Sequence, residues 1–383
     1  MNFSGYKRED GRFGTRNHVM VMSSVACANG VVDAISRALP EIVPLTHPYG
    51  CGCGPEDLGV MMRTLSGLLN NPNVGAALVI GHGCENLNSS FLTQVVENKP
   101  IEALVIQDSG GSAATTAKGI EIASRFLKQL ERQERVSAPA SELIIALECG
   151  GSDAFSGITA NPAVGAAADL LVREGGTVIL SETTEMIGTA HILKRRCATP
   201  ELGEQVERLV NNHERHVRES LGELAGMVIA PGNIDGGLSS ITEKSLGCIR
   251  KGGTTPITEI VEYAGKPTNR GFVIMDTPGY DIDSMAGMAA AGAQLILFTT
   301  GRGSVAGFPA IPVVKVCSNS RTFNKMPGDM DVNAGAITDA GKTIEEVGRQ
   351  IFDLALEVAS GKRTCAELNR SIPFNYLKQG PTF

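Results

Sequence analysis

Four segments of the chain group side chains that can bind a metal ion or move a proton. The first two, residues 46–54 and 81–86, carry imidazole and thiol groups at His47, Cys51, Cys53, His82 and Cys84. Glycines separate these residues, and glycine adopts the positive φ angles that let close neighbours converge on one ion. Imidazole and thiolate ligands are typical of iron and zinc sites. A glycine-rich turn with incidental thiols is the structural alternative for both segments.

The third segment combines a thiol with small polar residues, and the fourth carries two carboxylates. Residues 148–162 begin with a glutamate and Cys149 and run into a predicted helix. Backbone N–H groups at a helix start can bind a carboxylate, although Asn161 there also suits simple helix capping. Glu182 and Glu185 lie three positions apart, which favours acid–base work or metal binding. Acidic residues in a first helical turn are the structural alternative.

We take each of these four segments to follow a strand, and for the last three segments that strand is among those predicted below. Ligands in open α/β sheets bind at the carboxyl ends of the strands, so we expect the four segments to form one site on one sheet. Lys244 and Arg302 add cationic groups, and an arginine fork can hold a carboxylate by two hydrogen bonds. The loop around Arg302 resembles a dinucleotide-binding turn only superficially, because Pro309 and Pro312 follow it instead of a helix.

Short apolar runs typical of strands alternate along the chain with amphipathic stretches typical of helices. The predicted strands are residues 18–24, 76–80, 103–107, 143–148, 177–181, 272–275, 294–299 and 313–317. The predicted helices are residues 30–39, 58–69, 112–132, 162–173, 202–224, 282–291 and 344–360. This alternation predicts an α/β fold with mainly parallel sheets and right-handed crossovers.

The length of 383 residues suits two domains. We place the boundary near residue 227, where a charged helix gives way to a segment rich in proline and glycine, residues 230–237. Residues 1–226 are then an α/β domain that carries the Cys/His metal-site loops. Residues 227–383 are expected to be a Rossmann-like α/β domain that carries substrate-binding motifs and has no dinucleotide site.

The bulk composition excludes several classes of function. With a net charge of −7 and no basic patch, the chain is not expected to bind nucleic acid. The amino terminus lacks the apolar core of a signal peptide and no apolar run is long enough to span a membrane, so we expect a cytoplasmic protein. Nine cysteines, an odd number, do not indicate a disulfide framework there. Cys197 and Cys317 fall in regular patterns and are expected to be buried as small apolar residues.

The chain resembles the altronate/galactarate dehydratase family. The resemblance covers nearly the whole chain and is carried by residues 46–51, 79–86, 147–162, 182–188, 231–237, 243–247, 298–303 and 361–365. It implies an iron(II)-requiring enzyme that dehydrates hexonic or hexaric acids to 2-keto-3-deoxy acids. The family also includes the large subunit of sulfolactate sulfo-lyase, which releases sulfite and forms pyruvate. Cys53 departs from the pattern of the altronate enzymes.

The fused members of this family begin with a small extra domain, whereas this sequence starts directly at Gly5 and Tyr6. We therefore expect a separate small subunit and an oligomeric enzyme acting on a small hydroxy acid. Three functions stay open: a sugar-acid hydro-lyase, a carbon–sulfur lyase acting on sulfolactate, and a non-catalytic ligand-binding subunit.

Removal of a proton next to a carboxylate needs a base and strong stabilisation of the enediolate, and the leaving group needs an acid. We assign the metal, Fe²⁺ or an iron–sulfur cluster, to His47, Cys84 and Cys149, with Cys51 and Glu185 next. The expected carboxylate-binding residues are Lys244 and Arg302. The candidate bases are His82 and Glu182.

Overall fold

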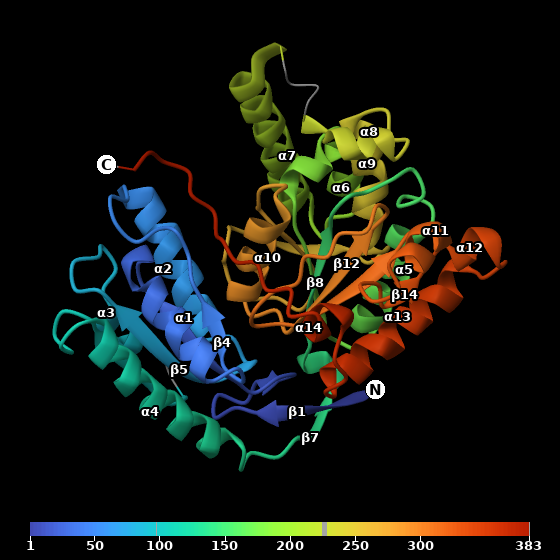
Figure 1. The fold of residues 1–383 in the computed structure, drawn as a ribbon. Coiled ribbons are helices and arrows are strands. Elements are labelled where there is room, and N and C mark those ends of the chain that lie inside the picture. The colour runs from blue at the N-terminus through green and yellow to red at the C-terminus, as the bar shows by residue number, and fades with distance from the viewer. Residues whose placement is uncertain (97, 224–227, 383) are drawn as a thin grey trace.

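Two parallel sheets form the frame of the molecule (Figure 1). The computed structural model describes residues 1–96, 98–223 and 228–382. The smaller sheet has four strands in the order β4-β3-β5-β6. Their bounds are β3 His18–Ser23, β4 Val43–Leu45, β5 Val74–Gly81 and β6 Ile101–Val105. All residues of β5 are buried, as expected of a central strand with helices on both faces.

The larger sheet has seven parallel strands in the order β10-β11-β9-β8-β12-β13-β14. Their bounds are β8 Ile144–Cys149, β9 Thr177–Leu180, β10 Ile257–Val261, β11 Gly271–Met275, β12 Leu295–Thr300, β13 Val313–Cys317 and β14 Val332–Asn333. A small antiparallel sheet, β2-β1-β7, ties the amino terminus to the segment between the two large sheets. Its strands are β1 Asn2–Lys7, β2 Phe13–Gly14 and β7 Val136–Pro139.

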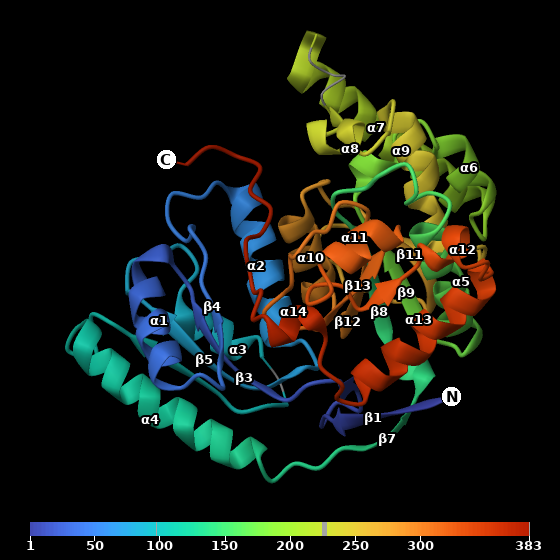
Figure 2. The ribbon, with the colours of Figure 1, turned by 45° about the vertical axis from the view of Figure 1, so that its right-hand side comes forward.

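Helices cover both faces of the four-stranded sheet. On one face α1 (Asn29–Ala38) and α4 (Ser112–Leu130) enclose an apolar core with β3 and β5. On the other face α2 (Pro55–Leu69) packs against α10 (Asp281–Ala290), which covers the seven-stranded sheet. The core therefore continues from one sheet to the other through the pair α2 and α10, as two views show (Figures 1 and 2).

The opposite face of the seven-stranded sheet is covered by α5 (Ala160–Arg173) and α13 (Ile344–Ala359). A group of helices lies beyond the carboxyl ends of its strands, where α7 projects from the body of the molecule (Figure 2). The remaining helices are α3 Ser89–Gln94, α6 Ala190–Arg195, α7 Pro200–Leu221, α8 Pro231–Asp235, α9 Ile241–Cys248, α11 Ser320–Lys325, α12 Ala336–Asp339 and α14 Cys365–Leu368. Within the described part of the chain, no helix combines the length and apolar composition needed to cross a membrane.

The structure confirms the α/β fold with mainly parallel sheets and corrects how the four segments are arranged. The first two segments follow β4 and β5, whereas the third and fourth follow β8 and β9 of the other sheet. They therefore lie on two sheets and not on one, because strand pairing across the chain assigns them to different sheets. The boundary expected near residue 227 lies outside the described residues. Strands from before and after it pair directly, β9 with β11 and β8 with β12.

Candidate active site

Two thiols and a carboxylate converge beyond the carboxyl end of β8. Cys149 ends that strand, Glu185 lies in the short 3-10 helix η3 (Thr183–Met186) after β9, and Cys248 ends α9. The thiols of Cys149 and Cys248 donate to Glu185 Oε2 over 2.7 Å and 2.6 Å, and their sulfur atoms are 3.6 Å apart. All three side chains are buried.

This group fits one metal ion. The ligand atoms of Cys149, Glu185 and Cys248 lie within 4.8 Å of one another. Metal–sulfur bonds of about 2.3 Å at a tetrahedral angle place two sulfur atoms about 3.8 Å apart, close to the separation found here. Burial raises the pKa of Cys149 well above its usual value, so the thiolate requires a nearby cation. A bound metal ion supplies that charge and deprotonates its thiol ligands.

Lys244 places a cation beside this group. It lies on α9, four residues before Cys248, and pairs with the carboxylate of Glu185. Although burial favours the neutral carboxyl group, the ammonium of Lys244 lowers the pKa of Glu185 to about 2. Glu185 is therefore ionised at neutral pH and is available as a ligand.

Three carboxyl groups meet on the other side of β8. The ligand atoms of Glu148, Glu182 and Asp281 lie within 4.8 Å of one another. Successive side chains of a strand point to opposite faces, so Glu148 faces α10 while Cys149 faces away from it. Ser284 on α10 donates to Glu148 Oε2 over 2.7 Å.

Glu182 connects the two groups. Its Oε2 accepts hydrogen bonds from the backbone N–H of Cys149 over 3.0 Å and from Lys251 Nζ over 3.1 Å. Its backbone is left-handed, with φ of 64°, a strained state for a residue with a side chain and one that is common at functional sites. The N–H of Glu182 donates to Thr277 Oγ1 over 2.6 Å, which helps to hold this conformation.

The three carboxyl groups are suited to proton transfer. Within the described part of the chain, the buried Oε1 atoms of Glu148 and Glu182 have no hydrogen-bond partner. Burial, reinforced by neighbouring carboxylates, raises the pKa of both groups and raises that of Asp281 to about 7. A carboxyl group with such a pKa can exchange a proton at neutral pH.

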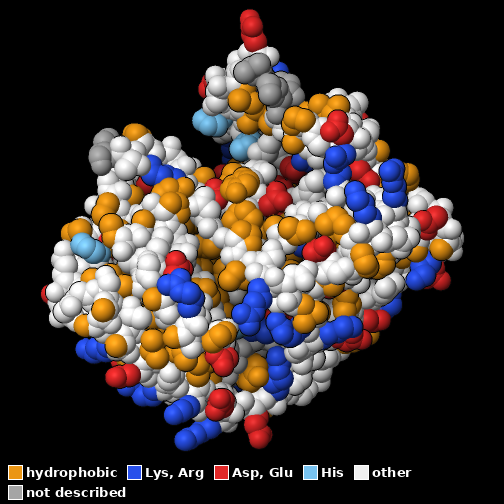
Figure 3. All heavy atoms as spheres, viewed as in Figure 1, with side chains coloured by type: hydrophobic (Ala, Val, Ile, Leu, Met, Phe, Trp, Pro, Cys, Tyr) orange, Lys and Arg blue, Asp and Glu red, His pale blue; other side chains and the backbone are white. Residues whose placement is uncertain are grey.

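A cavity of about 350 Å³ adjoins the thiols. Its lining includes Cys248 and Lys244 from α9 and Ser152 and Asn161 from the segment after β8. Ser152 Oγ and Asn161 Oδ1 are buried and have no hydrogen-bond partner among the residues that the structure describes. Asn161 lies in the first turn of α5, and its unpaired Oδ1 does not cap the helix. Unpaired buried polar atoms of this kind suit a polar ligand with several hydroxyl groups. Acidic side chains are visible in the hollow below α7 on one face of the molecule (Figure 3).

Comparison with known proteins identifies the relatives of this chain. Residues 5–131 match the model "D-galactarate dehydratase/Altronate hydrolase, second domain", and residues 140–382 match "D-galactarate/Altronate dehydratase, C-terminal". The chain belongs to the galactarate/altronate dehydratase family. Named proteins of this family are lyases, and the family membership supports lyase activity here.

Three relatives illustrate the range of the galactarate/altronate dehydratase family. Galactarate dehydratase (L-threo-forming) of Escherichia coli is 38% identical over 94% of this chain and 73% of its own length. Altronate dehydratase of Bacillus subtilis is 33% identical over 99% of this chain and 78% of its own length. The (2R)-sulfolactate sulfo-lyase subunit beta of Chromohalobacter salexigens is 33% identical over 95% of this chain and 94% of its own length.

Within this family member, several residues singled out from the sequence lie away from the thiol pair. His47 is buried, its Nε2 hydrogen-bonds with the carbonyl oxygen of Ser23 over 3.0 Å, and its Nδ1 accepts from the N–H of Tyr49 over 3.3 Å. Both ring nitrogens are thus engaged with the main chain. Cys51, Cys84 and His82 follow strands of the four-stranded sheet; His82 Nδ1 contacts Cys84 Sγ at 3.3 Å.

Arg302 follows β12, next to the segment that carries Cys149. Its N–H donates to the carbonyl oxygen of Gly151 over 2.8 Å, and its guanidinium is 4.0 Å from Asp235. The side chain is 45% exposed, so its nitrogen atoms remain accessible. Of the two cysteines expected to be buried, Cys317 is buried in β13, whereas Cys197 is only partly buried and donates to the carbonyl oxygen of Leu193.

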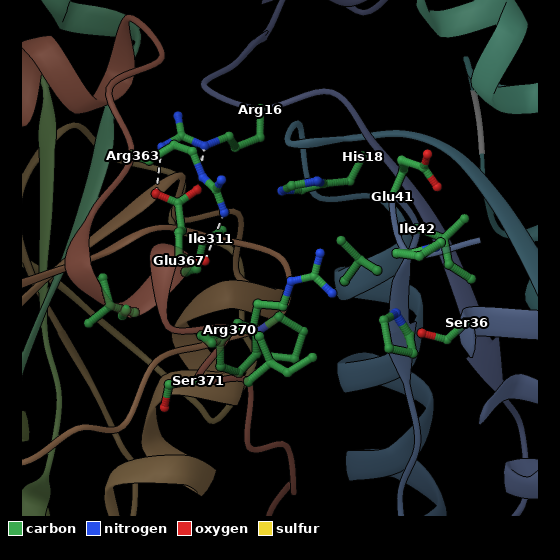
Figure 4. Close-up of a pocket in the computed structure, with 18 of the residues that line it drawn as sticks. Arg16, His18, Ser36, Glu41, Ile42, Ile311, Arg363, Glu367, Arg370 and Ser371 are labelled. Atoms are coloured by element: carbon green, nitrogen blue, oxygen red, sulfur yellow. Dashed lines mark hydrogen bonds and ion pairs between the residues drawn. The ribbon is translucent and has the colours of Figure 1, made fainter. Parts of the chain in front are cut away.

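Another cavity, of about 640 Å³, shares no lining residue with the cavity next to Cys248. It lies at the start of β3, between His18 and the segment around Glu367 (Figure 4). The guanidinium of Arg16, on its wall, is committed to both carboxylate oxygens of Glu367 and to backbone carbonyls. We therefore take the smaller cavity next to Cys248 as the candidate active site.

Sequence reasoning missed four residues of the site: Glu148, Cys248, Lys251 and Asp281. Cys248 carried a usable signal, because residues four apart on a helix share a face and Lys244 was already singled out. Asp281 begins a helix and belongs to no motif, so only the fold brings it to Glu148 and Glu182.

Proposed function

We propose that this chain removes water from a sugar acid of the galactarate or altronate type and yields a 2-keto-3-deoxy acid in the cytoplasm. The observation that carries the proposal is the convergence of Cys149, Glu185 and Cys248 beside a cavity with unpaired polar atoms. These three residues would hold Fe²⁺, which supplies Lewis acidity for the developing negative charge and for the departing oxygen. Thiolate and carboxylate ligands suit iron.

Three residues that line the cavity, and Arg302 on the loop after β12, have distinct tasks in this proposal. Ser152 and Asn161 pair with hydroxyl groups of the sugar acid through their free polar atoms. Lys244 and Arg302 neutralise the substrate's carboxylate, and Lys244 becomes available when Glu185 binds a metal ion. The substrate's carboxylate then lies beside buried side chains with little water around it. Ion pairs are stronger in such a low-dielectric environment.

Glu182 is the base that we propose. Its free Oε1 belongs to a group of three carboxyl groups that can share and release a proton. Its Oε2 is fixed by Lys251 and by the N–H of Cys149, which orients the carboxylate. His82 follows β5 of the four-stranded sheet. Within the described part of the chain it has no hydrogen bond to Cys149 or Cys248.

Sulfolactate cleavage is the second candidate, because the chain matches 94% of the length of a relative named as a sulfo-lyase subunit. The two reactions share proton removal and differ in the leaving group. Purified protein should be supplied with Fe²⁺ and incubated with galactarate, altronate or sulfolactate. Formation of a 2-keto-3-deoxy acid supports dehydration, whereas release of sulfite with pyruvate assigns the second reaction. Chelation should abolish turnover and Fe²⁺ should restore it; full activity without metal would contradict the metal assignment.

We further propose that a separate small subunit completes the enzyme. The name "subunit beta" of one relative supports a multi-subunit arrangement. A cover over the cavity would exclude water and strengthen the electrostatic stabilisation of an enediolate. The assay is turnover of the chain with and without the candidate partner, with circular dichroism to show that the chain alone is folded. Full turnover by the isolated chain would contradict this proposal.

A further inference from the structure

Three thiols outside the proposed active site gather at the carboxyl end of the four-stranded sheet. Cys27 follows β3, Cys51 follows β4 and Cys84 follows β5, so three neighbouring loops each carry one of them, and the loop after β4 also carries Cys53. All three side chains are exposed. Exposed thiols are prone to oxidation. Three of them at one edge of a sheet therefore indicate a functional role.

The backbone holds these loops together. The N–H of Ala26 donates to the carbonyl oxygen of Tyr49 over 2.8 Å, and the N–H of Asn86 donates to that of Gly50 over 3.0 Å. Gly50 has φ of 121°, and a Cβ atom there would lie 2.6 Å from the Cα of Val25. The loop of Cys51 therefore depends on glycine to reach the loop of Cys27. The fold thus sets the relative positions of the three thiols.

The loop of Cys51 lies between the other two loops. Its residues Tyr49 and Gly50 accept backbone hydrogen bonds from Ala26, next to Cys27, and from Asn86, two residues after Cys84. Three thiolates on this edge would repel one another unless a positively charged centre lay between them. His82 contacts the sulfur of Cys84 over 3.3 Å, and such contacts to thiolate ligands tune metal centres.

The spacing distinguishes this edge from the site at Cys149. Among the described residues, the sulfur atoms of Cys27, Cys51 and Cys84 do not form a group within 4.8 Å of one another, whereas the ligand atoms at Cys149 do. One small ion requires close ligands, but a centre with several iron atoms spans a wider set of thiolates.

We propose that Cys27, Cys51 and Cys84 hold an iron–sulfur cluster, separate from the ion at Cys149. Cys53 is excluded from the ligand set because its thiol is directed to the carbonyl oxygen of Cys51, at 3.6 Å. Three thiolates leave one iron atom without a cysteine ligand. The cluster lies at the end of β3 opposite to the start of that strand at His18, where the larger cavity is found.

Anaerobic reconstitution of the full chain with Fe²⁺ and sulfide tests the proposal. Acid-labile sulfide, bound iron and the visible absorption of the cluster are measured after removal of free reagents. Cys27→Ser, Cys51→Ser and Cys84→Ser should each reduce labile sulfide severalfold or more. Cys53→Ser, which alters a thiol two residues from Cys51, and Cys197→Ser, in the other sheet's domain, should retain the wild-type amount. Circular dichroism confirms that each variant is folded.

Two results would overturn the proposal. One is binding of zinc or single iron ions without labile sulfide, and the other is full cluster content in the triple variant of the three cysteines. Cys248→Ser separates this inference from the proposed function, because it should remove the ion at Cys149 and leave labile sulfide unchanged. Loss of sulfide in that variant alone would place the cluster at the other site.

Discussion

The ion pair between Lys251 and Glu182 offers a stringent test of how the proposed active site is built. Lys251 Nζ lies 3.1 Å from Glu182 Oε2, and each side chain is 1% exposed. Burial alone would lower the pKa of Lys251, but the Cys149 thiol and Glu182 raise it well above its usual value. Lys251→Met keeps most of the side chain's volume and removes only the charge.

Loss of one partner from a fully buried ion pair costs about 3–5 kcal/mol, because the other charge stays buried and unpaired. For a domain of about 150–250 residues, a loss of 1 kcal/mol in the free energy of unfolding lowers the melting temperature by about 2–4 °C. We therefore expect Lys251→Met to lower the melting temperature by about 6–20 °C. Glu182 can relieve the cost by binding a proton, since burial already raises its pKa.

Protonation of Glu182 in Lys251→Met determines whether the stability of the variant rises or falls with pH. The pKa of Glu182 in the folded variant lies above the value of an unfolded glutamate, so the folded state binds more protons between the two values. Stability then falls as pH rises through this window. The deficit of Lys251→Met should be larger at a pH of about 8 than at about 5. Glu182→Gln combined with Lys251→Met should recover much of the loss.

Thermal unfolding followed by circular dichroism at the two pH values provides the measurement. Lys362→Met is the matched control, because it removes an exposed lysine paired with Glu357 at 2.8 Å, and exposed pairs contribute little. Equal stability of Lys251→Met and the wild type at both pH values would refute the reasoning, since Glu182 would then not need its partner.

Three further predictions concern the site directly. Cys248→Ser should lower iron bound at Cys149 at least tenfold in direct metal analysis, whereas Cys365→Ser should not; equal iron content would remove Cys248 from the ligand set. Arg302→Lys should lower kcat/KM about tenfold, because one charged hydrogen bond is worth about 1.5–3 kcal/mol, and unchanged kinetics would give Arg302 a structural role. Asp281 has its pKa raised to about 7, so Asp281→Asn should change the pH–rate profile near neutrality; an unaltered profile would exclude it from proton transfer.

The strands and helices were predictable where the pattern is local. The strand predicted at residues 76–80 is confirmed as the core of β5, and the helix predicted at 344–360 as α13. The three-residue β4 was missed because so short a run carries no period. The edge strand β10, with buried ends and three partly buried residues between them, was missed because its apolar residues do not alternate clearly.

The grouping of the four segments into one site was wrong for a different reason. A strand followed by a polar loop predicts the edge at which a side chain lies, but not the sheet. Cys84 follows β5 and Cys149 ends β8, and both strands are parallel to their neighbours, yet β5 pairs with β3 and β8 pairs with β9 and β12. Sheet membership depends on pairing between residues far apart in the chain, which no single segment encodes.

The closeness of α9 to β8 explains why Cys248 can complete the metal ligands, and it leads to a last prediction. A Cβ atom on Gly247 would lie 2.9 Å from the Cα of Gly157, a backbone atom that cannot turn aside. Gly247→Ala must therefore move α9 away from the segment after β8 and separate Cys248 from Cys149. Iron affinity should fall although every ligand is retained. The measurement is iron titration of the folded variant, with Gly59→Ala in α2, where a Cβ atom has room, as the matched control. Wild-type affinity in Gly247→Ala would show that Cys248 reaches the ion without the close approach of α9.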